Sequence, residues 1–191
     1  MTWNHFHFPP FYPFFIESLH YPWAPAWYLH DDSTMYRTTT NPAGNLTIES
    51  GSSNLWIADK PAQTNLTFPP GVWTGRITLE TPLASGESFS VAVGNSSGGV
   101  FAASGSAVIN GDGGTEFDFQ ITADSFEMVK DDYLAVNITD TTTGIEVKTG
   151  GTQSYLVLLD NAPPYPVPEL PGVFLIMVGL LMLVGFVGRR W

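Results

Sequence analysis

Four stretches of the chain alternate strictly between apolar and polar residues. They cover 71–80, 88–93, 116–121 and 133–138. A period of two is typical of a strand with one face in a core and the other in water, so the pattern predicts half-buried antiparallel strands. The side chains expected to face inward are Trp73, Ile77, Leu79, Phe89, Val91, Val93, Phe117, Phe119, Ile121, Leu134, Val136 and Ile138.

Turn-forming residues separate these stretches. Glycine, asparagine and aspartate gather at 94–99, 110–114 and 149–152, where their tolerance of positive φ suits hairpin turns. Further short strands are predicted at 54–58, 65–68, 100–109, 126–130, 144–148 and 154–159. About nine or ten short strands predict a mainly β fold: an antiparallel two-sheet β-sandwich, jelly-roll-like, over residues 29–160. The core aromatics are expected to be Trp56, Trp73, Phe89, Phe101, Phe117 and Phe119.

The last part of the chain follows a different pattern. A proline-rich segment at 161–171 is predicted to be a semi-rigid stalk. The 18 residues from Pro171 to Gly188 carry no charge and would span about 27 Å as a helix, so a single C-terminal transmembrane helix is predicted at 172–188. Arg189 and Arg190, within the basic tail 189–191, would stop it at the cytoplasmic side. The alternative is a buried core helix.

The order of features at this end resembles a sorting signal. Val167, Pro168, Glu169, Leu170 and Pro171 precede the apolar run, and the arginine pair follows it. This arrangement resembles the archaeal PEF-CTERM signals, which archaeosortases recognise, although typical members have phenylalanine where this chain has leucine. The resemblance implies an archaeal surface protein, an archaeosortase as partner, cleavage near the motif and transfer to a lipid or other anchor.

The first 28 residues hold eleven aromatic residues and five prolines. No lysine or arginine precedes Arg37, and the prolines break any helix, so a secretory signal peptide is not indicated. Three interpretations stay open for 1–28: a misplaced start codon with the true signal lost, an aromatic arm that associates with a membrane, or an extended strand that packs on the domain.

Composition and charge exclude several classes of partner and chemistry. The net charge is −11 and there are no cysteines. An acidic chain is a poor partner for nucleic acid, which needs clustered lysine and arginine. Without cysteine the fold has no disulfide, thiol nucleophile or cysteine-based zinc site, and no cofactor or metal is indicated.

Four sequons suggest glycosylation, at Asn45, Asn65, Asn95 and Asn137. Enzyme motifs are missing: there is no nucleophile elbow, phosphate loop or zinc-protease helix, and His30 is the last histidine. The neighbouring acids Asp31–Asp32 and Asp131–Asp132 would point to opposite faces of a strand. The chain is therefore predicted not to be an enzyme.

These features predict a non-catalytic cell-surface protein with its N-terminal domain outside the cell, held by membrane lipid and structural or adhesive in the envelope. Its partners would be glycans or other envelope proteins. The alternative is a surface module that binds carbohydrate or Ca²⁺. Carbohydrate would use an exposed aromatic among Trp56, Trp73, Tyr133 and Tyr155, and Ca²⁺ would use Asn110, Asp112 and Glu116.

Overall fold

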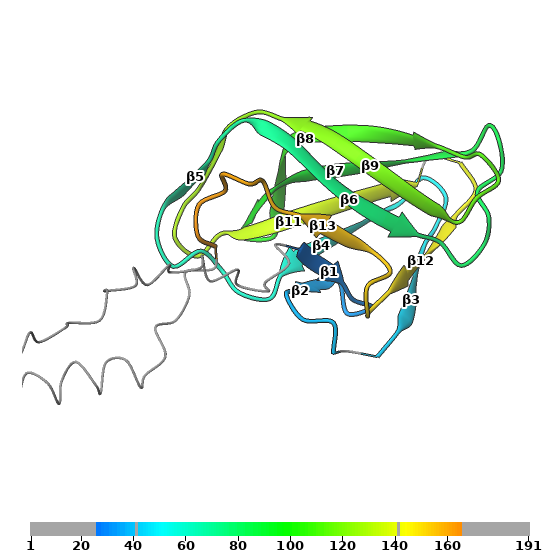
Figure 1. The fold of residues 1–191 in the computed structure, drawn as a ribbon, viewed down its shortest axis with the longest axis horizontal. Coiled ribbons are helices and arrows are strands. Elements are labelled where there is room, and N and C mark those ends of the chain that lie inside the picture. Colours follow the sequence, from blue (N-terminus) through cyan, green and yellow to red (C-terminus); the bar gives the residue numbers. More distant parts are fainter. Residues whose placement is uncertain (1–25, 41, 141, 166–191) are drawn as a thin grey trace, which may run out of the picture.

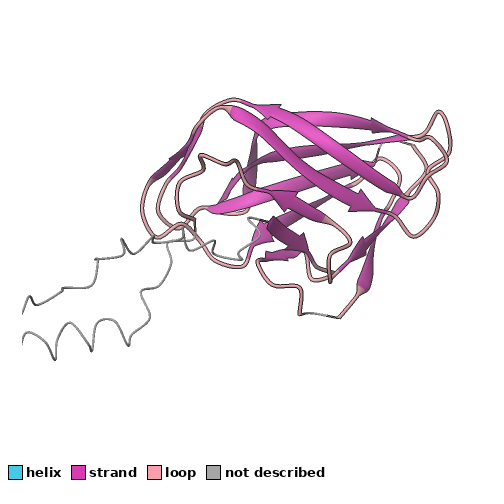
Figure 2. Cartoon of the chain, in the orientation of Figure 1, coloured by secondary structure: helices cyan, strands magenta, loops and turns pink. Residues whose placement is uncertain are grey.

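The computed structural model describes residues 26–40, 42–140 and 142–165. In this part of the chain there are thirteen β-strands and no helix (Figure 2). The strands are β1 (Ala26–Leu29), β2 (Thr34–Tyr36), β3 (Gly44–Ile48), β4 (Ser53–Ala58), β5 (Leu66–Phe68), β6 (Gly71–Thr78), β7 (Ser88–Ser97), β8 (Val100–Asn110), β9 (Glu116–Ala123), β10 (Phe126–Met128), β11 (Tyr133–Asp140), β12 (Ile145–Thr149) and β13 (Tyr155–Val157).

Nine of these strands form one sheet, in the order β8-β7-β11-β4-β2-β1-β13-β6-β9. All neighbours pair antiparallel except β2 and β4, which are parallel, so the sheet is mixed. The pairs β5–β10 and β3–β12 form two small separate sheets. In Figure 1 β5 lies at one end of the domain and the β3–β12 pair at the other.

The large sheet curls until its two edge strands meet. The Asp124 backbone N–H, just after β9, donates to the Ser104 carbonyl of β8 (3.1 Å). The Ser104 hydroxyl donates to the Asp124 carbonyl (2.6 Å). The sheet is therefore a nearly closed barrel, joined at one crossing of β8 and β9.

This architecture corrects the predicted fold. The chain is mainly β, but the antiparallel two-sheet, jelly-roll-like sandwich is wrong, because the short strands β1 and β2 join the two halves into one mixed sheet. Alternation shows which face of a strand is buried but not which strands are neighbours. The transmembrane helix predicted at 172–188 lies outside the described residues. Among those described, no helix is long and apolar enough to cross a membrane.

The core lies inside the curled sheet, and the face assignments are confirmed. All twelve side chains expected to face inward are buried, with Phe117 the most exposed at 6%. Trp56, Trp73 and Phe89 are fully buried, whereas Phe101 is only half-buried, so its assignment to the core is wrong. Within the small β5–β10 sheet, Phe68 of β5 stacks on Phe126 of β10, with ring centroids 4.9 Å apart.

The described chain begins and ends at neighbouring points. Trp27 of β1 and Tyr165 are both buried, and their rings lie 5.7 Å apart. The Arg37 guanidinium lies over the Trp27 ring (5.4 Å) and donates from Nη1 to the Tyr165 carbonyl (2.9 Å). Residues 161–165 therefore pack against the domain, and the chain leaves it at a fixed position beside the start of β1.

Candidate functional site

A groove of about 580 Å³ opens on the outer face of the sheet. It lies over β2, β4 and the start of β11, and two turns form its rim. Its lining residues are Asp32, Ser33, Thr34, Leu55, Ile57, Ser96, Gly98, Gly99, Asp131 and Tyr133. We refer to this set as the β4 groove. Its volume falls within the range of ligand pockets in proteins, about 300–1,000 Å³.

Apolar side chains from two adjacent strands form the floor of the β4 groove. Leu55 and Ile57 alternate along β4 with the buried Trp56, so both face outward, and both are partly exposed. Tyr133, also partly exposed, begins β11, which pairs with β4 along Ala135–Ile57. The floor thus offers an aromatic ring and two aliphatic side chains to water.

Two carboxylates stand at the rim. Asp32 accepts the Thr34 backbone N–H at Oδ1 (2.9 Å) and the Tyr36 hydroxyl at Oδ2 (3.0 Å). The hydrogen bond to Asp32, with a little burial, raises the pKa of Tyr36 above its ordinary 10.0. Asp131 is exposed, and none of the hydrogen bonds or ion pairs found in the described chain uses its carboxylate. Asp32 is therefore held in place, while Asp131 is open to a ligand.

Backbone strain gathers at the same rim. Ser33 (φ 61°) and Asp131 (φ 74°) are the only non-glycine residues of the described chain with positive φ, and both line the β4 groove. This conformation costs of order 1–2 kcal/mol for an L-residue. Strained backbone conformations of this kind are found preferentially at functional sites, where they hold the chain in a particular geometry.

The electrostatics of the β4 groove favour some ligands and disfavour others. Its lining includes two acids and no lysine, arginine or histidine. A negatively charged ligand would meet unpaired carboxylates and no compensating cation. The arrangement suits a ligand that has apolar faces and hydrogen-bond donors and is not an anion.

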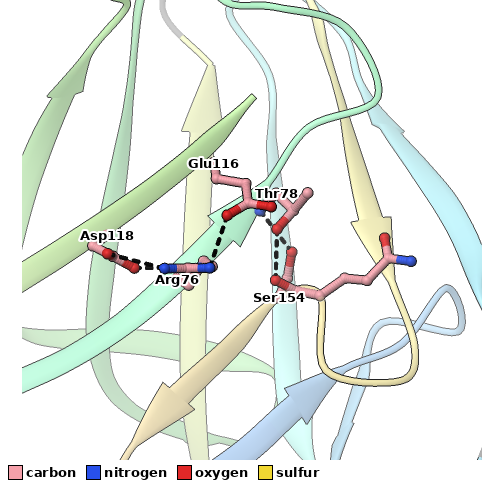
Figure 3. A network of polar contacts seen from close by, with 6 residues as sticks. Arg76, Thr78, Glu116, Asp118 and Ser154 are labelled. Atoms are coloured by element: carbon pink, nitrogen blue, oxygen red, sulfur yellow. Dashed lines mark hydrogen bonds and ion pairs between the residues drawn. The ribbon is translucent and has the colours of Figure 1, made fainter. Parts of the chain in front are cut away.

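A second groove of about 420 Å³ lies over β13, β6 and β9, with Tyr155 and Asp118 among its lining residues. Its charges are already paired. Arg76 binds Asp118 with two nitrogens (2.7 and 3.1 Å) and Glu116 with the third (2.8 Å), as Figure 3 shows. Next to this cluster the Ser154 hydroxyl accepts the Thr78 N–H (3.0 Å). We therefore interpret this groove as a part of the sheet's own stabilising network.

The four sequon asparagines lie on separate elements. Asn45 and Asn65 are exposed, at β3 and just before β5, whereas Asn95 of β7 and Asn137 of β11 are half-buried. Each makes a side-chain hydrogen bond: Asn45 donates to Glu80 and Glu146, Asn65 accepts the Lys130 N–H, Asn95 donates to Asp132 and Asn137 donates to Thr139 of its own sequon. They do not converge on a common site.

Other residues named from the sequence are separated in space. Trp56 and Trp73 are fully buried, so of the four aromatic candidates only Tyr133 and Tyr155 reach the surface. Glu116 binds Arg76, and Asp112 accepts the Gly114 N–H of its own turn (2.8 Å). Within 26–40, 42–140 and 142–165 no three acidic or histidine side chains gather in a way that could hold a metal ion.

His30 and the adjacent acid pairs also have separate positions. His30 is 2% exposed, its ring lies 4.7 Å from that of Tyr36, and its Nε2 has no hydrogen-bond partner. Asp132 is buried and accepts the Val129 N–H and the Asn95 amide, while its neighbour Asp131 faces the β4 groove. Sequence reasoning missed that one acid from each pair lines the same groove, because 99 positions separate Asp32 from Asp131 (131 − 32).

The predicted sorting motif, Val167, Pro168, Glu169, Leu170 and Pro171, lies outside the described residues. So do Arg189 and Arg190 and most of the aromatic segment 1–28, of which 26–28 belong to β1.

No protein-family model matches the chain, and no curated protein matches its sequence. Solved structures match its fold. A CocE/NonD family hydrolase from Staphylococcus aureus superposes with a TM-score of 0.55 at 8% identity, over 70% of this chain and 36% of the hydrolase. An alpha-amino acid ester hydrolase gives 0.54 at 8%, over 71% and 36%. An aminopeptidase from the marine sediment archaeon Thaumarchaeota archaeon gives 0.53 at 7%, over 70% and 36%.

These matches correct the prediction that the chain is not an enzyme, because the fold it shares is found in two hydrolases and an aminopeptidase. The matched region is about a third of the length of each of those proteins. At 7–8% identity the likeness establishes the shared fold and assigns no chemistry to the residues of this chain.

Proposed function

We propose that the chain is a cell-surface protein whose β domain is displayed outside the cell by its C-terminal segment, anchored to membrane lipid. The proposal starts from the sequence after Tyr165: a proline-rich linker, an uncharged apolar run and an arginine pair. Arginines beside an apolar run favour the cytoplasmic side of a membrane, which would leave the domain on the other side.

The observation that carries the proposal is the attachment of Tyr165. Its hydroxyl donates to the Lys60 carbonyl (2.6 Å) and accepts the Leu134 N–H (3.2 Å), and its carbonyl accepts Arg37 (2.9 Å). A residue held by three hydrogen bonds gives the following segment a fixed point of departure. A domain held by that segment would keep one region toward the membrane and the rest of its surface free.

Two further features support display at a surface. Asn45 and Asn65, the sequon residues with exposed side chains, would be available to a glycosylation system outside the cytoplasm. The net charge of −11 favours solubility and repels anionic partners such as nucleic acid. The imperfect PEF-CTERM resemblance adds the expectation that an archaeosortase processes the C-terminal segment.

The location is tested with the full chain expressed in an archaeal host. We expect the protein to stay with membranes through an alkaline carbonate wash, to be released by detergent, and to be digested by proteinase K added to intact cells. An R189E/R190E double variant should lose its fixed orientation and become partly protected, while an E80Q/E87Q variant, which changes two domain charges, should behave as the parent. Release by the carbonate wash, or full protection in intact cells, would refute the proposal.

Processing is tested on the same membranes by mass spectrometry of the C-terminus. Cleavage by an archaeosortase would end the mature chain near Pro168–Glu169–Leu170, and an E169A substitution should leave the segment attached. If the parent chain retains Trp191, no processing has occurred. The membrane location is then decided by the fractionation result alone.

A further inference from the structure

We infer that the β4 groove is a binding site for a neutral carbohydrate chain, with Tyr133 as the stacking platform and Asp131 as the principal hydrogen-bond acceptor. This inference goes beyond surface display, and it depends on the groove alone. Carbohydrate binding requires an exposed aromatic ring, acceptors for hydroxyl groups and a groove long enough for more than one residue of sugar.

The floor of the groove provides the first requirement. The face of a pyranose ring is lined by C–H groups, which pack on apolar and aromatic surfaces. Tyr133 offers its ring at the surface, with Leu55 and Ile57 of the neighbouring strand beside it. All three side chains are partly exposed, and a rigid ring loses little entropy when a ligand packs on it.

The rim provides the acceptors. Sugar hydroxyls donate best to carboxylates, because hydrogen bonds to ionised acceptors are stronger than those between neutral groups. Asp131 is exposed, with its backbone held by the Ala62 carbonyl and the Asp132 N–H bonded back to Val129. Its positive φ of 74° places it on a tight turn, which sets the direction of its Cα–Cβ bond.

A glycine turn forms the part of the rim next to Asp131, because Ser96 of β7 pairs with Tyr133 of β11. Gly98 and Gly99 both have positive φ (56° and 83°) and follow Ser97, where β7 ends. No atom other than those of adjacent residues would lie within 4 Å of a Cβ at either position, so the turn projects into open space. A ligand lying along the floor could therefore approach the backbone at Gly98 and Gly99 and extend past the groove without a steric barrier.

Charge selects the class of carbohydrate. Uronic acids, sulfated sugars and phosphate-bearing chains would bring negative charge to Asp32 and Asp131 with no basic residue in the lining to compensate it. An amino sugar would be attracted to the unpaired Asp131 carboxylate and to the acidic chain as a whole, an attraction that salt screens and that needs no stacking on Tyr133. Neutral hexoses and N-acetylated hexosamines meet no repulsion from the acids and depend on stacking and hydrogen bonds alone.

The test uses the full chain in a polyoxyethylene detergent, because a glycoside detergent would itself compete for the groove. Isothermal titration calorimetry and NMR shift mapping are made with neutral hexasaccharides (cellohexaose, maltohexaose, mannohexaose and N-acetylchitohexaose). Hexagalacturonate is the anionic probe, and the deacetylated chitohexaose is the cationic one. We expect at least one neutral probe to bind, with shifts at Tyr133, Ile57 and Asp131 and little dependence on salt. The anionic probe should bind more weakly, and any binding of the cationic probe should be lost at high salt.

The variants assign the binding to the groove. Y133A should weaken the neutral probe about tenfold or more, as truncation of a central aromatic does. D131N, which keeps the size and the tolerance of positive φ, should weaken it several-fold through the loss of the charged acceptor. Y155A removes the half-exposed tyrosine of the other groove and should leave the affinity unchanged.

Three results would overturn the inference: no binding of any neutral hexasaccharide at millimolar concentration, tighter binding of the anionic probe, or equal affinity for the parent, Y133A and D131N. If Y133A does not fold, D131N and shift mapping of the parent still decide the matter. None of these outcomes depends on where the protein resides in the cell, so the surface proposal and the binding site fail or succeed separately.

Discussion

At the scale of single residues, Tyr165 has more interactions than its place near the end of the domain would suggest. It is 1% exposed, its ring lies against Trp27 and Phe68, and its hydroxyl bonds to one carbonyl and one N–H that belong to different segments, Lys60 and Leu134. One side chain therefore ties the end of the described chain to β1, β5 and β11.

Replacement of Tyr165 by phenylalanine should leave the ring packing intact and remove both hydroxyl bonds. The Leu134 N–H would then lose its partner in a buried place, which costs about 1–3 kcal/mol, and the Lys60 carbonyl would lose one hydrogen bond. Urea unfolding of the full chain in polyoxyethylene micelles measures the loss. Y155F, at a half-exposed tyrosine, is the matched control, and equal stabilities of the two variants would contradict the role given to the hydroxyl.

The same hydroxyl makes stability depend on pH in the alkaline range. Burial raises the pKa of Tyr165 to about 12, so between its ordinary 10.0 and about 12 the folded protein keeps a proton that the unfolded chain loses. The free energy of unfolding should therefore be independent of this group below pH 10 and fall as the pH rises from 10 to 12. The advantage of the parent over Y165F, measured by urea unfolding at pH 9 and pH 11.5, should shrink; a constant advantage would contradict the argument.

At the scale of strands, the side chain of Arg76 on β6 links this strand to its neighbour β9. Arg76 stands opposite Asp118 in the register and also reaches Glu116. The hydrogen bond and charge of Arg76 lower the pKa of Asp118 below its ordinary 3.8. All three side chains are substantially exposed, so solvent screens much of their attraction.

The substitution R76A should therefore lower the free energy of unfolding by less than about 1 kcal/mol. R76K keeps the charge but loses the two-pronged contact, and its stability should lie between those of the parent and R76A. The stabilisation by the Arg76–Asp118 ion pair is present above the ordinary pKa of Asp118. It disappears as the pH falls through the lowered pKa that Asp118 has in the folded protein. Thermal unfolding of the parent and R76A at pH 7 and pH 2.5 tests this prediction. If the parent is more stable than R76A by the same amount at pH 2.5 as at pH 7, the ion pair is not the source of the stabilisation.

Strands also show how far the sequence predicts the structure. The alternation within β6, β7, β9 and β11 was readable because each strand has eight or ten residues and one face in the core. The strands β1 to β3 have only three to five residues, too few to establish a period, and they were missed. Equally short strands such as β5 and β10 were predicted only because they are short apolar stretches between turns. The turn expected at 94–99 begins later, since β7 continues to Ser97. The β4 groove could not be predicted from the sequence, because it forms only when β2 pairs in parallel with β4.

At the scale of the whole molecule, the barrel depends on the crossing of β8 and β9. A Cβ placed on Gly105 would lie 2.5 Å from the Thr122 carbonyl oxygen and 2.8 Å from the Ala123 Cα. The close approach of the strands needs a residue without a side chain at this point.

G105A should therefore force the edges apart and break the hydrogen bond from Asp124 to Ser104, at a cost of about 1–3 kcal/mol. Amide hydrogen exchange is the direct measurement, and the Asp124 amide should exchange much faster in G105A. A102S, at an exposed position of the same strand, should leave that amide as slow as in the parent. Unchanged exchange at Asp124 in G105A would mean that the barrel does not depend on this contact.

The position of β13 between β1 and β6 has a consequence for how the protein is made. Ala26 of β1 pairs with Val157 of β13, 131 positions further along the chain (157 − 26). During synthesis β1 can pair with β2 on one edge, but its other edge must wait for nearly the whole domain before β13 exists, and one edge of β6 also waits for β13. Such long-range pairing folds slowly. The nascent chain would thus present two open strand edges for most of its translation, and this interval is when a chaperone would matter most to its yield.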